Sequence, residues 1–109
     1  MKKTFLFLAL VATLGLSACM VPGKATVNFI NHSSISVDFY LDGAVFAGGP
    51  FPHTASLTGQ EWAGISPGDH TLGAVPNPPV LGQNPLYQSV TLSANQMRWW
   101  TITDGLVSN

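Results

Sequence analysis

The segment ISVDFYLDG at residues 35–43 gives the clearest indication of the fold class of this chain. Apolar and polar side chains alternate over residues 35–41, and a period of two is typical of a strand with one face on a core. The Asp42-Gly43 pair that follows favours a type I′ hairpin, in which both central residues adopt positive φ angles. The sequence therefore predicts a strand over 35–41, a tight turn and a short returning strand over 44–47.

The rest of the chain beyond residue 24 continues this pattern. Turn-forming residues separate further short apolar-polar segments, and the loops 48–59 and 76–85 are rich in glycine and proline. We see no segment with helical periodicity there. The predicted strands cover residues 25–31, 35–41, 44–47, 60–65, 70–75, 86–92 and 97–104. This spacing predicts an all-β fold, a small antiparallel immunoglobulin-like sandwich of about seven strands.

Aromatic side chains are the expected centre of the core. Adjacent residues of a strand point to opposite faces, so one of Trp99 and Trp100 is expected inside and the other outside. The sequence does not indicate which is which. The expected core aromatics are Phe29, Phe39, Trp62, Trp99 and Trp100.

The N-terminus has a different character. A basic start at Lys2 and Lys3 precedes an apolar run from Thr4 to Leu16, which is shorter than the roughly 20 residues that a membrane-spanning helix needs. This order is typical of a secretory signal peptide. The run ends in Leu16-Ser17-Ala18-Cys19, which resembles the lipobox of bacterial lipoproteins.

The lipobox resemblance implies a specific maturation. The Cys19 thiol would receive a diacylglyceryl group, the signal helix 1–18 would be cleaved off, and the new amine would be acylated, commonly with palmitate. Several acyl chains make a stable membrane anchor. The expected organisation is then a lipidated linker at 19–24, a sandwich domain at 25–105 and a tail at 106–109.

The residue after the cysteine bears on the location. In enterobacterial lipoproteins an aspartate there usually retains the protein at the inner membrane, and this chain has Met20. In a Gram-negative host the resemblance therefore implies the inner leaflet of the outer membrane, with the domain facing the periplasm.

Two stretches of the domain resemble a second family. VDFYLDG at 37–43 and ISPGDHTL at 65–72 are similar to the two signatures of a family of uncharacterised immunoglobulin-like envelope domains. The resemblance covers about residues 25–105, and the proline-rich stretch 76–85 departs from it. The family has no established catalytic residues, so the resemblance transfers none.

Charge and residue types restrict the function. Without residues 1–18, the chain keeps two basic side chains, Lys24 and Arg98, against five acidic ones, which gives no electrostatic footprint for nucleic acid. A single cysteine precludes an intramolecular disulfide. The histidines at 32, 53 and 70 lack the spacing of metal ligands, and no Gly-x-Ser-x-Gly elbow occurs. We expect no catalytic residues, metal or cofactor.

The leading hypothesis is a non-enzymatic lipoprotein whose sandwich acts as a structural or interaction module, as an accessory of a larger envelope assembly with an envelope protein partner. The alternative is a module that binds glycan or an extended peptide through exposed aromatic side chains. A hydrolase with an unrecognised site is the third hypothesis. Glu61 and Asp69 could face each other across a glycosidic bond, but nothing in their spacing argues for it. The candidate ligand-binding residues of the alternative are Tyr40, Tyr87, Trp99 and Trp100.

Overall fold

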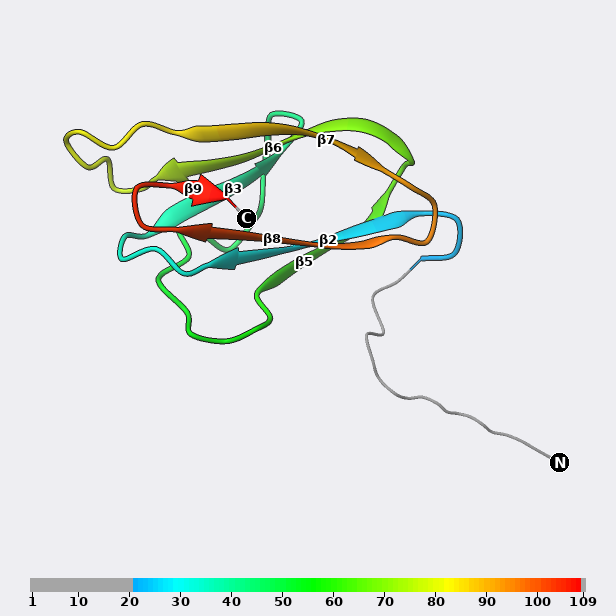
Figure 1. Cartoon of the computed structure of the whole chain (residues 1–109), viewed down its shortest axis with the longest axis horizontal. Helices are drawn as coiled ribbons and strands as arrows, with labels where there is room; N and C mark the ends of the chain where they lie inside the picture. The colour runs from blue at the N-terminus through cyan, green and yellow to red at the C-terminus, as the bar shows by residue number, and fades with distance from the viewer. Residues whose placement is uncertain (1–20, 109) are drawn as a thin grey trace, which may run out of the picture.

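A computed structural model describes residues 21–108, and they form two packed four-stranded sheets (Figure 1). The predicted all-β sandwich is confirmed. One sheet has the order β5-β2-β8-β9 and the other β4-β3-β6-β7. The strands are β2 (Ala25–Asn31), β3 (Val37–Leu41), β4 (Ala44–Val45), β5 (Gln60–Ile65), β6 (Gly68–Pro76), β7 (Leu86–Leu92), β8 (Met97–Thr103) and β9 (Val107–Ser108). The predicted signal helix and Cys19 lie outside the described residues.

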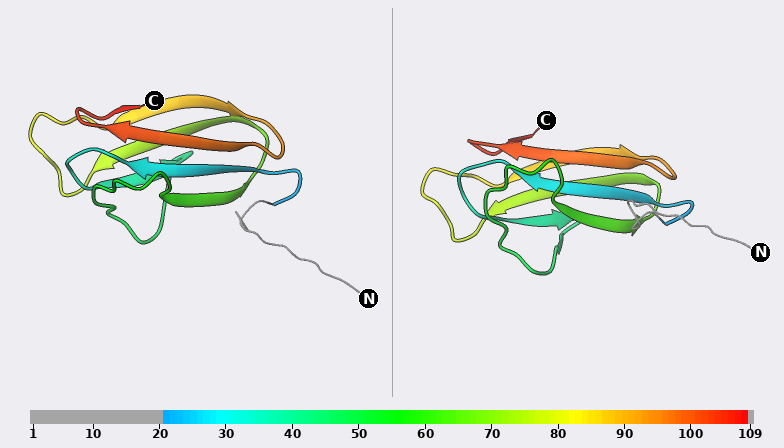
Figure 2. Two further views of the ribbon diagram at one scale, coloured as in Figure 1. Left: turned by 60° about the horizontal axis from the view of Figure 1, so that its bottom comes forward. Right: turned by 90° about the horizontal axis from the view of Figure 1, so that it is seen from below.

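Five of the six strand pairings are antiparallel, and the pairing of β2 with β8 is parallel. The parallel pair arises because the turn 93–96 carries the chain from β7 in one sheet to β8 in the other, where β8 runs beside β2 in the same direction (Figure 2). The sequence does not reveal this pairing, because it depends on which sheet each strand joins. Among residues 21–108 there is no helix that could span a membrane.

The Asp42-Gly43 hairpin adopts the predicted turn. Asp42 has φ 50° and Gly43 φ 84°, so both central residues are in the left-handed region that a type I′ turn requires. The returning strand β4 has only two residues, shorter than predicted. At the C-terminus, Val107–Ser108 form β9 against the end of β8, within the segment expected to be a tail.

The core is aromatic at its centre. Phe29 and Phe39 stack with their ring centroids 4.9 Å apart, and the Trp100 ring meets Phe29 edge-on at 5.8 Å. All three side chains are fully buried, whereas Trp99 is 55% exposed. Trp62 is partly buried and packs edge-on against Phe46 at 5.3 Å. The expectation of one inner and one outer tryptophan is confirmed, with Trp100 inside.

The two flanks of the sandwich are closed differently. On the flank formed by β4 and β5, residues 46–59 run along the sheet edges and bond to them. Phe51 exchanges both backbone hydrogen bonds with Val37, at 2.7 and 3.1 Å, and Thr54 N–H donates to the Asn31 carbonyl at 2.8 Å. We call this the closed flank. On the other flank the edge strands are β7 and β9, and the indole N–H of Trp100 on β8 links the two sheets by donating to the Gln88 side-chain oxygen on β7 at 2.8 Å. We call this the open flank.

A buried amide organises the closed flank. Asn31 Nδ2 donates to the carbonyls of Ile35 and Phe51, at 2.8 and 2.9 Å. Its Oδ1 accepts from the N–H and the hydroxyl of Ser33, at 2.9 and 2.6 Å. The Ile35 carbonyl accepts the hydrogen bond from Asn31 and not one from a neighbouring strand. The strand predicted from residue 35 therefore begins only at Val37. One side chain thus fixes both the turn after β2 and the loop that covers the flank.

Candidate functional site

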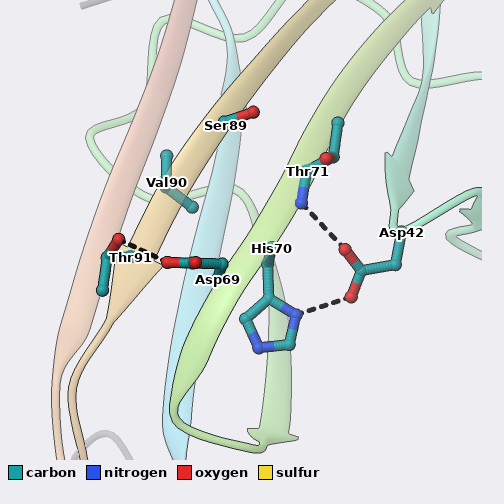
Figure 3. A pocket seen from close by; sticks show the side chains of 7 residues that line it. All are labelled: Asp42, Asp69, His70, Thr71, Ser89, Val90 and Thr91. Carbon is teal, nitrogen blue, oxygen red and sulfur yellow. Dashed lines mark hydrogen bonds and ion pairs between the residues drawn. The ribbon is translucent and has the colours of Figure 1, made fainter.

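The two stretches that carry the envelope-domain resemblance meet at one end of the sandwich, in a pocket of about 380 Å³ (Figure 3). Asp42 comes from the β3–β4 hairpin, and His70 and Thr71 come from β6. Asp42 Oδ1 accepts from Thr71 N–H at 2.8 Å, and the Asp42 N–H donates to the Thr71 carbonyl at 2.8 Å. Asp42 Oδ2 lies 2.5 Å from His70 Nδ1. The hairpin is therefore bonded to β6 by one carboxylate.

The surroundings of His70 favour its charged form. Its Nδ1 faces the Asp42 carboxylate, and its Nε2 lies 2.6 Å from the Ser66 carbonyl oxygen. Both partners are acceptors, so both ring nitrogens donate only when the ring is an imidazolium. The hydrogen bond to Asp42, helped by the Ser66 carbonyl, raises the pKa of His70. Hydrogen bonds from His70 and from the Thr71 N–H lower the pKa of Asp42.

We call Asp42, His70 and Thr71 the clasp, because their hydrogen bonds join the hairpin to β6. A histidine that activates a hydroxyl needs a ring nitrogen free to accept the proton. In His70 both nitrogens face other acceptors, and the ring points toward Asp42, away from Ser89 and Thr91 on β7 (Figure 3). The Thr91 hydroxyl donates to Asp69 at 2.7 Å. The pocket therefore holds the hairpin against β6 without presenting a nucleophile paired with a base.

Two of the predicted ligand-binding aromatics share a surface. Tyr40 on β3 and Tyr87 on β7 both pair with Gly73 on the intervening strand β6, on the outer face of that sheet. A Cβ on Gly73 would lie 2.7 Å from Tyr87 Cε1 and 3.3 Å from Tyr40 Cβ. The Tyr87 ring therefore covers Gly73 and extends toward Tyr40. Tyr87 remains 59% exposed.

The two tryptophans do not belong to this surface. Trp99 is exposed on the outer face of the other sheet, on β8. Trp100 is fully buried and its N–H is bonded to Gln88, so it cannot contact a surface ligand and is removed from the candidate set. The four predicted residues thus divide into a tyrosine pair, one tryptophan on the opposite face and one core residue.

Two of the three histidines lie close together. The rings of His32 and His53 have centroids 6.4 Å apart. Each also bonds to a carbonyl, His32 Nε2 to Ser56 at 3.0 Å and His53 Nδ1 to Ser33 at 3.0 Å. In the described part of the chain, no three His, Cys, Asp or Glu side chains gather in a way that could hold a metal ion.

The acidic residues considered from the sequence are dispersed. Glu61 and Asp69 belong to different sheets, on β5 and β6. Asp38 accepts a hydrogen bond from Asn77 Nδ2 at 2.8 Å, which ties β3 to the proline-rich loop. Asp104 Oδ1 accepts from Ser34 N–H at 2.7 Å, and this bond lowers the pKa of Asp104. The sequence could not show these pairings, because each joins segments far apart in the chain.

Comparison with known proteins gives no relative. The chain matches no known protein family, no curated protein and no solved structure.

Proposed function

We propose that this protein is a lipid-anchored module of the bacterial cell envelope, whose sandwich serves a structural or interaction role without catalysis. The observation that carries the proposal is the Leu16–Cys19 lipobox, which ends six residues before the first core residue, Ala25. Among residues 21–108, every buried core residue lies between Ala25 and Leu106.

The geometry near the anchor supports this arrangement. The Gly23 N–H donates to Asn95 Oδ1 at 2.8 Å, and the Asn95 N–H donates to the Lys24 carbonyl at 2.9 Å. Residues 21–24 are thus fastened to the turn 93–96, and a lipid on Cys19 would hold this end of the sandwich next to the membrane. The proline-rich loop lies at the opposite end (Figure 1). Leu81 in this loop is fully exposed.

The absence of catalysis is supported by the clasp. Both ring nitrogens of His70 face acceptors, the Asp42 carboxylate and the Ser66 carbonyl, so neither is open to accept a proton from a substrate, as a general base requires.

The test is intact-mass analysis of protein extracted from membranes of the native host. We expect a chain that begins at Cys19 and carries the additional mass of the acyl groups. The Cys19→Ala variant should keep residues 1–18 and carry no lipid. A species beginning at Met1, or one beginning at residue 19 without acyl mass, would contradict the anchor. Crosslinking in intact cells, followed by mass spectrometry, would then identify the envelope partner.

One observation favours a second candidate, the binding of glycan or peptide. The Tyr87 ring is supported from below by Gly73, which leaves its other face to solvent, and such a ring suits stacking against a sugar or a peptide side chain. Titration with peptidoglycan fragments, followed by calorimetry, would test it. Tyr87→Ala should abolish the heat of binding, and Trp99→Ala, which removes an equally exposed aromatic from the other face, should leave it unchanged.

A further inference from the structure

The four edge strands of the two sheets are not equally protected. An edge strand exposes backbone N–H and C=O groups that can pair with another chain, and proteins block this with short strands, bulges, prolines or charges. β4 and β9 have two residues each. β5 carries Glu61 and a bulge, where its register with β2 shifts next to Gly64 at φ 74°. These three edges are poor templates for pairing.

The fourth edge, β7, has none of these protections. It is seven residues long and pairs with β6 without interruption, from Leu86 opposite Ala74 to Leu92 opposite Gly68. Its sequence, LYQSVTL, contains no charge, proline or glycine. Figure 1 shows β7 as a long, regular strand at the margin of the sandwich.

The side chains of β7 are complementary to a second copy in the antiparallel direction. If Ser89 lies opposite itself, Tyr87 faces the partner's Thr91, and both are exposed on the outer face. Leu86 then faces the partner's Leu92 on the core side. Contacts across a two-fold axis require such self-complementarity, in which each side of the strand meets the same side of its copy.

Charge also makes β7 a better strand than the other edges for pairing with a second copy. In a two-fold pairing the residue on the axis lies opposite its own copy, so a charged residue there would meet a like charge. A pairing of β5 centred on Glu61 would bring together two Glu61 side chains, and a pairing of the uncovered part of β8 centred on Arg98 would bring together two Arg98 side chains. On the outer face beside β7 the nearest charge is Asp69, one strand inward, where it accepts the Thr91 hydroxyl.

We propose that two copies of this chain pair through their β7 strands, antiparallel and with Ser89 on the two-fold axis, so that two four-stranded sheets become one continuous sheet. This pairing does not depend on the lipid anchor. Seven residues give a contact line of only about 23 Å. One strand pairing of this length is a small interface, so the association should be weak and depend on concentration.

The first test uses single cysteines in the full chain, oxidised on isolated membranes. Side chains directly opposite in an antiparallel pair are close enough for a disulfide. Ser89→Cys should form a disulfide-linked dimer at least about tenfold faster than Thr71→Cys, because pairing raises the effective concentration of the thiols. Thr71 is exposed on the same face, one strand inward. The parent chain reports any contribution from Cys19.

The second test reads the register. Tyr87→Cys and Thr91→Cys should crosslink poorly alone and efficiently when the two chains are mixed. Equal dimer yields for Ser89→Cys and Thr71→Cys, a Ser89→Cys adduct with a different protein, or self-crosslinks at residue 87 that exceed the mixed product would each overturn the proposal. If a cysteine variant fails to fold, Ser89→Lys replaces it. That variant should abolish the concentration-dependent dimer in detergent, and Thr71→Lys should keep it.

Discussion

The closed and open flanks of the sandwich differ in how the backbone groups at their strand edges are covered. On the closed flank the loop 46–59 takes the place of a neighbouring strand. It bonds to the edge of β3 through Phe46 and Phe51 and to the end of β2 through Thr54. On the open flank the strand β7 is long and uncharged, and among residues 21–108 its neighbour in the sheet is β6 on one side only.

The difference shows where this chain can interact through its backbone. On the closed flank the backbones of Val37 and Phe39 on β3 and of Asn31 at the end of β2 are already bonded to the loop, and the loop's own Phe46 ring packs against Phe51 and Trp62. The open flank is sealed inside by Trp100 and Gln88 but keeps an edge that another strand can extend.

The largest effect is expected from the interior of the open flank. Trp100→Ala removes a fully buried ring that contacts Phe29 and Phe39, and it should lower the free energy of unfolding by about 3–5 kcal/mol. Trp99→Ala, at the adjacent exposed position, should change it by no more than about 0.5 kcal/mol. Chemical denaturation of both variants measures the difference. Similar losses would mean that the inner and outer assignments are wrong.

The closed flank should be most sensitive at its buried amide. Asn31→Asp turns the Nδ2 donor into an oxygen that faces the carbonyls of Ile35 and Phe51, and we expect a loss of about 2–4 kcal/mol at neutral pH. Ser33→Ala keeps both Asn31 donors and should cost about 1 kcal/mol. Equal losses in equilibrium unfolding would show that Asn31 does not hold the loop.

A smaller effect is expected from the clasp as the pH changes. The folded pKa of His70 lies above its ordinary value of 6.5, so its contribution is complete below pH 6.5 and is lost as the pH rises through the folded pKa. The folded pKa of Asp42 lies below 3.8, so its contribution is present above that pH and is lost in acid. Stability from the pair should be greatest between about pH 4 and 6.5.

The size of this pH effect is limited by solvent. The Asp42 side chain is 49% exposed, so the pair should contribute about 1 kcal/mol or less. Asp42→Asn, which tolerates the positive φ of the hairpin, should remove most of the decline in stability above pH 6.5. Unfolding curves across this range provide the measurement. An unchanged alkaline decline in the variant would assign it to other groups. Asp104, whose pKa is also lowered, contributes only to the loss of stability in acid.

The smallest effect on stability is expected on the exposed face of β7. Ser89→Lys adds one charge at an exposed position and should change the free energy of unfolding by less than about 0.5 kcal/mol. It should nevertheless remove the dependence of Tm on protein concentration, since association stabilises the folded state. A Tm that rises with concentration equally in the variant and the parent would contradict pairing at this strand.

The strands and the Asp42-Gly43 hairpin are predictable from the sequence, because alternation and turn type depend only on residues that are neighbours in the chain. The parallel pairing of β2 with β8 was not predictable in this way, since it follows from the change of sheet after β7. The inner position of Trp100 likewise depends on the register of β8 in its sheet.

The candidate sites likewise depend on contacts between residues far apart in the sequence. Asp42 and His70 are 28 residues apart, and their meeting requires the register of β3 against β6. Tyr40 and Tyr87 were candidates because of their residue type, but what makes them a pair is Gly73, which lies between them in the sheet. The role of Asn31 was missed because, in sequence, it is one of several turn-forming residues.

The most direct test of the contrast between the flanks is residue-resolved amide hydrogen exchange on the full chain in detergent at low concentration. We predict slow exchange for the N–H groups of Val37, Phe46, Phe51 and Thr54, whose hydrogen bonds close one flank, and fast exchange for the β7 amides directed away from β6. Fast exchange throughout the loop 46–59, or uniform protection along β7 in the monomer, would contradict the account.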